Sequence, residues 1–133
     1  LPAAHDRKKS LPFIGLFHGS PVDHEEFLDA DTPEKRFKEM AKETNCEVVV
    51  TGHSHSPYHR YVHGVNFINP GSVGRMFDGC PDAAYAILEL TKGKISVSHL
   101  RCPYDVETVV RSLSEHQLPP IYGEMLRTAS KRN

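Results

Sequence analysis

Two short apolar runs, each closed by a turn that contains glycine and histidine, constrain the fold of this chain most strongly. The run at 13–17 precedes the sequence His-Gly-Ser-Pro, and the run at 46–51 precedes Gly-His-Ser-His-Ser-Pro. Apolar runs of this length that end at turn residues predict buried strands. The segment 33–44 between them predicts a helix. The order strand, helix, strand then favours a mixed α and β domain over a helical bundle or a pure sandwich.

The predicted helix over 33–44 has both a start signal and a buried face. Thr32 is placed to cap it, and Pro33 fits the first helical position. Phe37, Met40 and Ala41 follow the spacing i, i+3, i+4, so we expect them to form its apolar stripe.

Two hairpins and two helices are predicted for the second half of the chain. The first hairpin pairs 58–62 with 65–68, and the second pairs 83–90 with 95–100 around a Lys92-Gly93 turn. Asp105 is placed to cap a helix, and the prolines near 119 separate it from a last short helix. Sheet pairing beyond the hairpins does not follow from the sequence.

Composition and charge exclude several classes of protein. The 133 residues are 38% apolar and 25% charged, which excludes a disordered chain. No run approaches the roughly 20 apolar residues of a membrane span. The net charge of -1 offers no surface for nucleic acid or an anionic membrane. Three cysteines without clip spacing suggest thiols in a reducing cytoplasm.

Three of the nine histidines follow the predicted strands directly: His18, His53 and His55. Sites in α/β sheets lie at the carboxyl ends of strands, so we expect these side chains to converge. In an extended segment, His53 and His55 would project from one face with Cα atoms about 6–7 Å apart. They could then hold one metal ion together or two adjacent ions separately; a surface loop is the alternative. The other six histidines are interpreted as ordinary polar residues.

Three segments resemble successive motifs of the calcineurin-like metallophosphoesterases, in particular their small prokaryotic phosphodiesterase branch. They are 17–21, 49–57 and 67–74, with a helix and a hairpin between them in the same order. The resemblance covers about 13–102. It implies a four-layer αββα sandwich of the metallo-dependent phosphatase type. This chain, 1–133, would be the C-terminal half of that domain, with C-terminal helices over about 105–129.

The resemblance also implies a dinuclear metal centre that hydrolyses phosphate esters, with phosphodiesterase activity expected. His18 and His53 would ligate one divalent ion and His55 the other, the metal being manganese, iron, zinc or nickel. Such a centre polarises phosphoryl oxygens and generates a hydroxide nucleophile. Arg75 is a candidate substrate-binding residue, with a solvated loop arginine as the alternative. The acidic loop at 23–31 is interpreted as solvated, with an edge of the substrate cleft as the alternative.

The sequence departs from the family in lacking its N-terminal motifs: Asp-x-His, Gly-Asp-x-x-Asp, and Gly-Asn-His followed by Asp or Glu. Three imidazoles without a bridging carboxylate would bind one ion weakly and could not hold a pair. The proton donor of the family also lies in those motifs, so no catalytic residue is assigned here. We therefore expect the isolated chain to be inactive.

Two other functions remain open at this point. One is a non-catalytic binding protein that uses the phosphoesterase fold as a scaffold, as in retromer-type trafficking subunits. The other is a structural zinc domain, which would need a fourth ligand from Cys46 or Cys80. For the half-domain interpretation we expect exposed apolar surface near the strand at 13–17. An N-terminal half or a second copy of the chain would cover it.

Overall fold

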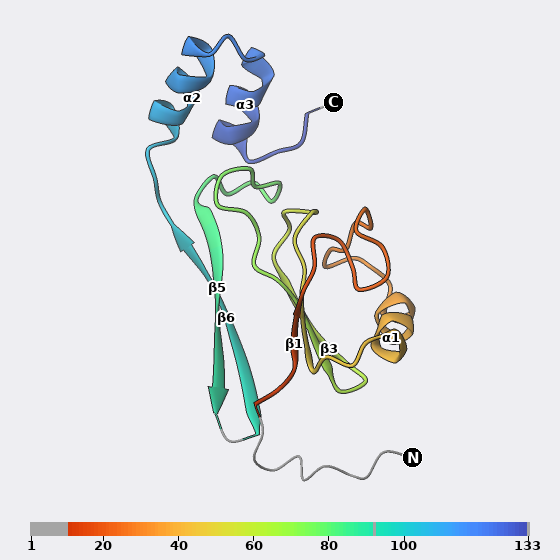
Figure 1. Cartoon of the computed structure of the whole chain (residues 1–133). Helices are drawn as coiled ribbons and strands as arrows, with labels where there is room; N and C mark the ends of the chain where they lie inside the picture. Colours follow the sequence, from red (N-terminus) through yellow and green to blue (C-terminus); the bar gives the residue numbers. More distant parts are fainter. Residues whose placement is uncertain (1–10, 92, 133) are drawn as a thin grey trace, which may run out of the picture.

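The computed structural model describes residues 11–91 and 93–132, which form six strands and three helices. Figure 1 shows their arrangement along the chain. The elements are β1 (Ile14–Leu16), α1 (Glu34–Glu43), β2 (Val48–Val50), β3 (Tyr58–Val62), β4 (Val65–Asn69), β5 (Ala83–Thr91), β6 (Lys94–Cys102), α2 (Val106–Glu115) and α3 (Pro120–Thr128).

A four-stranded sheet with the order β1-β2-β4-β3 forms the first half of the fold. β1, β2 and β4 run parallel, and β3 pairs antiparallel with β4 through the tight turn at His63 and Gly64. Helix α1 is the crossover that brings β2 back parallel to β1. β2 and β4 occupy the centre of the sheet, in keeping with the continuous apolar sequence of β2 and the burial of every residue of β4.

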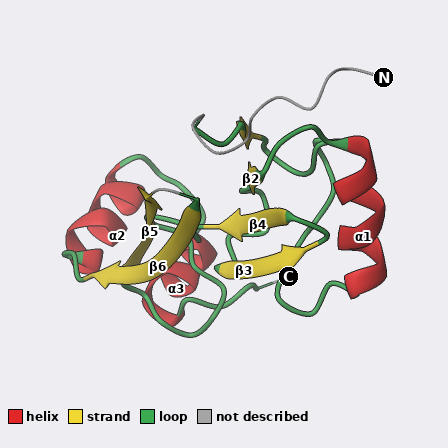
Figure 2. Cartoon of the chain, turned by 90° about the horizontal axis from the view of Figure 1, so that it is seen from below, coloured by secondary structure: helices red, strands yellow, loops and turns green. Residues whose placement is uncertain are grey.

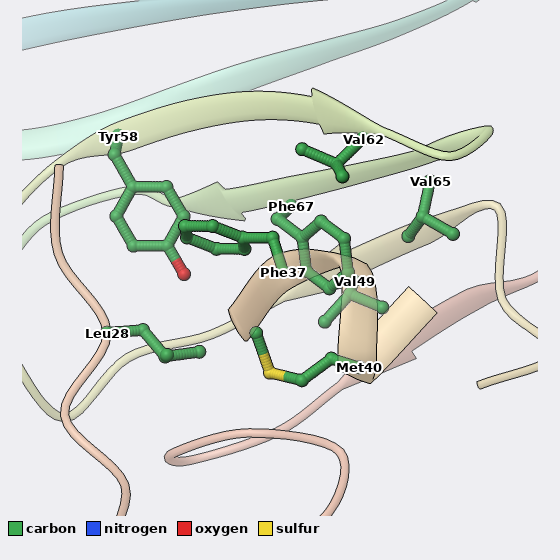
Figure 3. Packing of buried hydrophobic residues seen from close by; sticks show 8 residues of the cluster. All are labelled: Leu28, Phe37, Met40, Val49, Tyr58, Val62, Val65 and Phe67. Carbon is green, nitrogen blue, oxygen red and sulfur yellow. The ribbon is translucent and has the colours of Figure 1, made fainter. Parts of the chain in front are cut away.

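The main core lies between α1 and one face of this sheet (Figure 3). Phe37 of α1 is fully buried, with its ring centroid 5.2 Å from Phe67 and 5.7 Å from Tyr58. Burying an aromatic side chain of this size contributes about 2–3 kcal/mol. The buried members of this cluster are Leu28, Phe37, Met40, Val49, Tyr58, Val62, Val65 and Phe67.

The hairpin β5–β6 lies along the opposite side of the sheet from α1, and the α2–α3 pair lies beyond one end of that hairpin (Figures 1 and 2). Several hydrogen bonds join the hairpin to the end of β4 and to the loop that follows it, among them those of Arg101 to the Cys80 and Asp82 carbonyls. His99 Nε2 and the Asn69 carbonyl oxygen are 2.8 Å apart, and the Ala84 amide donates to the Ser72 carbonyl at 2.8 Å. The loop after β4 thus connects the sheet to the hairpin.

Most predicted elements are confirmed, with ends that differ by at most two residues. Asp105 caps α2 as predicted, since its Oδ1 accepts a hydrogen bond from the Thr108 amide at 2.9 Å. Lys92 of the predicted second turn lies outside the described residues. Within those residues, no helix is both long enough and apolar enough to cross a bilayer.

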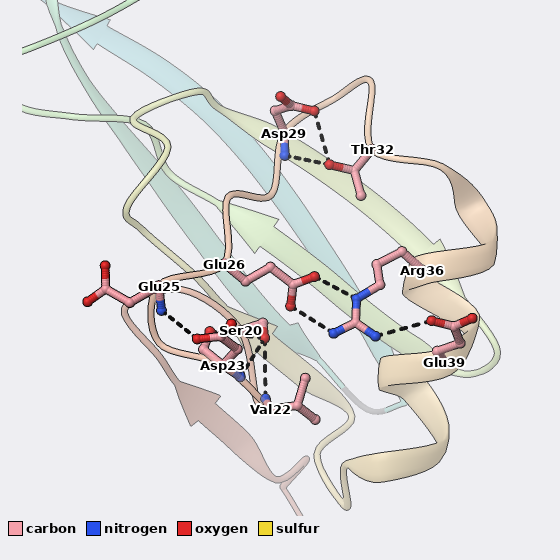
Figure 4. Close-up of polar contacts among 9 residues, drawn as sticks. All are labelled: Ser20, Val22, Asp23, Glu25, Glu26, Asp29, Thr32, Arg36 and Glu39. Atoms are coloured by element: carbon pink, nitrogen blue, oxygen red, sulfur yellow. Dashed lines mark hydrogen bonds and ion pairs between the residues drawn. The ribbon is translucent and has the colours of Figure 1, made fainter.

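The predicted cap of α1 is wrong. Pro33 occupies the N-cap position, and the cap makes no side-chain hydrogen bond. The Thr32 hydroxyl instead accepts from the Asp29 amide at 2.9 Å and donates to Asp29 Oδ1 at 3.0 Å (Figure 4). Threonine therefore closes the preceding loop, because a local partner competes with the helix amides for its oxygen.

The strand expected at 13–17 forms, but it is not buried as predicted. Phe13 is 74% exposed and Leu16 76% exposed. The reason is its position: β1 is an edge strand, paired only with β2 among the described residues. The strand predicted at 46–51 is central, and its Val48 and Val49 are fully buried.

Candidate metal centre

His18 and His53 meet at the carboxyl edge of the sheet. β1 and β2 are parallel neighbours, and the Gly52 amide donates to the His18 carbonyl at 2.9 Å just beyond them. This places His18 Nε2 2.8 Å from His53 Nδ1, with ring centroids 4.6 Å apart. At that distance at most one of the two nitrogens carries a proton. The predicted convergence of these two side chains is present in the structure.

A glycine fixes the turn that follows His18. A Cβ atom on Gly19 would lie 2.5 Å from the His24 carbonyl oxygen and 2.6 Å from that of Asp23. Backbone this close leaves no room for any other residue. The turn thereby starts directly after the imidazole and keeps it at the strand end.

His55 does not join this pair. Its Nδ1 lies 2.7 Å from the Arg75 carbonyl oxygen, and its ring stacks on Phe77 with centroids 5.3 Å apart. The extended geometry expected for His53 and His55 is wrong, because both residues have positive φ angles of 56° and 57°. Left-handed backbone at both positions turns the two rings toward different neighbours.

The backbone of His53 and His55 is strained, because both residues have positive φ angles. Non-glycine residues in the left-handed region cost about 1 kcal/mol or more each and persist where the surroundings enforce them. Here His53 and His55 flank Ser54, which is buried. Positive φ at two histidines of one loop supports a functional interpretation of the loop, since an unconstrained loop would relax.

Ser54 and Asn69 hold the loop in this conformation. Ser54 Oγ donates to the Leu28 carbonyl at 2.5 Å and accepts from Asn69 Nδ2 at 3.0 Å. The same amide group donates to the Gly52 carbonyl at 2.7 Å, and Asn69 Oδ1 accepts from the Gly71 amide at 2.9 Å. Ser54 is thus a structural residue, with its hydroxyl committed on both sides.

Below this loop, the Thr51 and Tyr58 hydroxyls lie 2.8 Å apart in the core. Burial raises the pKa of Tyr58 to about 12, so its hydroxyl stays protonated. A neutral phenol at this position stabilises the end of β2 without placing a charge near the histidines.

The loop between β1 and α1 reaches the imidazole pair through Phe27. The Phe27 ring centroid lies 4.2 Å from the His53 ring centroid. Lys131 Nζ lies 5.7 Å from the same Phe27 centroid. A bidentate ion pair between Glu26 and Arg36 anchors this loop to α1 (Figure 4). The Arg36 hydrogen bonds hold the pKa of the Glu26 carboxyl below its usual range. The acidic loop 23–31 is therefore held against α1, and its Phe27 lies beside His53.

The donor type of the His18–His53 pair fits a divalent transition metal, since neutral imidazole nitrogens bind manganese, iron, zinc and nickel. The number of donors is small. Among the described residues, no group of three or more His, Cys, Asp or Glu side chains is placed to hold an ion. The pair can therefore supply part of a coordination shell, and further ligands have to come from elsewhere.

Arg75 lies in the loop after β4, on the side of α3. Its guanidinium is 5.5 Å from the Phe77 ring centroid and 5.7 Å from that of Tyr122, and Nη2 is 3.7 Å from Met125 Sδ. The carbonyl of the same residue is the group that meets His55. Arg75 thus connects the histidine loop with the C-terminal helices.

Sequence reasoning did not identify the contacts that Phe27, Asn69 and Phe77 make in this region. Asn69 lies in the segment 67–74 that resembles a family motif, and its polarity at the end of a predicted strand was the available signal. Phe27 and Phe77 lie in loops, where no periodic pattern indicates which histidine a ring will contact.

Comparison with known proteins adds a family match. A family model described as the calcineurin-like phosphoesterase superfamily domain matches residues 4–93. A probable metallophosphoesterase of Mycoplasma pneumoniae is 32% identical over 71 residues, covering 53% of this chain and 45% of its own length. An uncharacterized protein of Methanocaldococcus jannaschii is 30% identical over 95 residues, covering 60% and 38% respectively.

Two solved structures show the same fold. A hypothetical protein from Pyrococcus horikoshii superposes with a TM-score of 0.78 at 18% identity, over 90% of this chain and 47% of its own. A metallophosphoesterase from Sphaerobacter thermophilus superposes with a TM-score of 0.75 at 24% identity, over 86% of this chain and 55% of its own. The chain spans about half the length of these relatives, and its mixed α and β architecture is that of the metallophosphoesterase fold.

Proposed function

Because the chain belongs to the calcineurin-like phosphoesterase superfamily, we propose that it supplies part of the active site of a metal-dependent phosphodiesterase. The observation that carries this proposal is the approach of His18 Nε2 and His53 Nδ1 to 2.8 Å at the ends of two parallel strands. A hydrolase of phosphate esters is the general activity of the family. Action on diesters, with two metal ions, is the finer part of the proposal.

In this proposal His18 and His53 hold one divalent ion and His55 contributes to a second. When bound, such ions polarise the phosphoryl oxygens and lower the pKa of water so that it attacks phosphorus. The chain's own residues position these ligands: Gly19 sets the turn after His18, and Asn69 orders the loop that carries the other two. Arg75 contacts the substrate in this scheme.

The missing ligands determine how the isolated chain behaves. The described residues offer no carboxylate to the imidazole pair, and a bridging carboxylate is what holds two cations close together. We therefore expect weak binding of a single ion and little hydrolysis by the chain alone. The complementary ligands would come from an N-terminal half of the domain, as suggested by the twofold length of the relatives.

Exposed apolar residues on β1 support the need for a partner. Leu16 of this edge strand and Phe13 just before it are exposed, and a further protein segment would bury them. The N-terminal half of the domain is the proposed occupant, and a second copy of this chain is the alternative.

All three cysteines are unpaired, which favours a reducing compartment such as the cytoplasm.

Calorimetric titration with manganese and zinc tests the metal assignment. We expect binding to the native chain that is lost in His18→Ala and in His53→Ala. His24→Ala is the matched control, because that side chain is 80% exposed and lies outside the pair. If the double variant His18→Ala/His53→Ala retains all bound metal, the assignment is wrong. Full turnover of bis-nitrophenyl phosphate by the chain alone with manganese would contradict the expected inactivity.

A second candidate function is a non-catalytic binding protein on the same scaffold. It is favoured by the separation of His55 from the imidazole pair, which leaves fewer than three ligands together in the described part of the chain. The same titration separates the two functions. Binding that depends on His18 and His53 supports the enzyme, and failure to bind any divalent metal supports the scaffold.

A further inference from the structure

A groove of about 400 Å³ lies between the loop after β4 and the α2–α3 pair. Sites for small organic molecules have volumes of roughly 300–1,000 Å³. Val109 and Tyr122 on its walls are 38% and 41% exposed, so the groove opens to solvent. The residues that define it here are Gly74, Arg75, Val109, Leu113, Tyr122 and Leu126.

Arg75 alone is charged among the described residues that line the groove. Its guanidinium lies near two aromatic rings, those of Phe77 and Tyr122. None of the ion pairs among the described residues includes Arg75. The rings restrict the orientation of the planar group and leave its charge uncompensated. Such a guanidinium can bind two oxygens of a phosphate or carboxylate.

The groove is joined to the histidine loop through the same residue. The Arg75 carbonyl lies 2.7 Å from His55 Nδ1, and its guanidinium is at the groove. The guanidinium and His55 also share the Phe77 ring, whose centroid lies 5.5 Å from the guanidinium carbon and 5.3 Å from the His55 ring centroid. Arg75 and Phe77 thus connect the groove with His55.

We propose that this groove binds the aromatic organic group of an aryl phosphate ester, with Arg75 contacting a phosphate oxygen. Val109, Leu113 and Leu126 supply the apolar walls, and the Tyr122 ring supplies a face for stacking. The orientation toward His55 rests on the proposed function, whereas binding in the groove does not. The preferred substrates are then esters with a planar aromatic group.

Titration of the full chain with phenyl phosphate, followed by NMR without added metal, tests this site. We expect shifts of the groove residues, and a Kd about tenfold weaker in Arg75→Gln because a charge-assisted contact is lost. Tyr122→Ala removes the stacking ring and weakens binding severalfold. Arg111→Gln is the matched control on α2, since that guanidinium bonds to the Thr108 hydroxyl and does not line the groove.

Several results would overturn the groove assignment. One is a Kd unchanged within twofold in both Arg75→Gln and Tyr122→Ala. Another is inorganic phosphate binding as tightly as phenyl phosphate, which would show that the apolar walls contribute nothing. If Arg75→Gln fails to fold, Tyr122→Ala decides the question.

The same titration in His18→Ala/His53→Ala separates this inference from the proposed function. Phenyl phosphate binding that persists in this variant, and still depends on Tyr122, supports the groove even where the native chain binds no manganese. Loss of phenyl phosphate binding in the folded double variant would place the ligand at the imidazoles and overturn the groove.

Discussion

The side-chain amide of Asn69 donates a hydrogen bond to Ser54 Oγ at 3.0 Å, between two residues that are both buried. Through this contact the end of β4 fixes the loop that carries His53 and His55. The same amide also holds the Gly52 carbonyl at 2.7 Å. Two segments that are distant in sequence therefore share one polar network at the carboxyl edge of the sheet.

Asn69→Ala should destabilise the fold by about 2–4 kcal/mol, because it leaves the Gly52 carbonyl and the Gly71 amide without their partner. Urea unfolding measures this loss. Asn66→Ala is the matched control: its amide is also buried, but it bonds to His59 and the Glu47 carbonyl, outside the histidine loop. Asn69→Ala should weaken metal binding and Asn66→Ala should not. Equal effects of both variants on metal affinity would contradict the role given to Asn69.

Much of the fold is predictable from the sequence because its elements carry local signals. The β-branched run of β2 predicts a central strand, and Asp105 predicts the start of α2 through its cap. The burial of β1 was not predictable in this way. An apolar run looks the same at the edge and in the centre of a sheet, and strand order depends on contacts between distant segments.

The candidate site was predictable only in part, for a similar reason. The positions of His18 and His53 after parallel strands predict that they meet, since strand ends share an edge. The direction of the His55 ring depends on a positive φ and on the Arg75 carbonyl. The local sequence predicts neither the φ angle of His55 nor its hydrogen-bond partner, which lies 20 residues away.

The left-handed backbone predicts an unusual ranking of glycine and alanine variants. His53→Gly and His55→Gly should each be more stable than the corresponding alanine variant by about 1 kcal/mol, because glycine adopts positive φ without a Cβ penalty. At His59, in the interior of β3, the order should reverse, since glycine weakens a strand. Thermal unfolding of the six variants checks the ranking. Alanine equal to glycine at His53 would show that this loop is not strained.

A change on β1 should alter association more than stability. Leu16→Ser removes an exposed apolar side chain from an edge strand, so we expect less self-association and a free energy of unfolding changed by less than about 0.5 kcal/mol. Sedimentation velocity over a range of concentrations measures the first effect. Val22→Ser is the control, because Val22 is also exposed, at 49%, but lies outside the strands. Equal self-association of Leu16→Ser and the native chain would argue against β1 as a covered surface.

The ion pair between Glu26 and Arg36 predicts a specific loss of stability in acid. The pKa of Glu26 is lowered in the folded chain from an ordinary value of 4.5, chiefly by hydrogen bonds from Arg36. The unfolded carboxylate therefore takes up a proton first as the pH falls. The stabilisation is complete above the unfolded pKa and is lost as the pH falls through the folded pKa.

Glu26→Gln should accordingly cost about 1 kcal/mol at pH 7 and much less near pH 3, a difference measured by urea unfolding at both values. Glu34→Gln is the matched control on α1. Its carboxylate pairs with Lys38 in solvent, where the charges are screened, so its variant should change stability little at either pH. A Glu26→Gln variant that follows the native pH dependence would show that this pair does not anchor the loop beside His53.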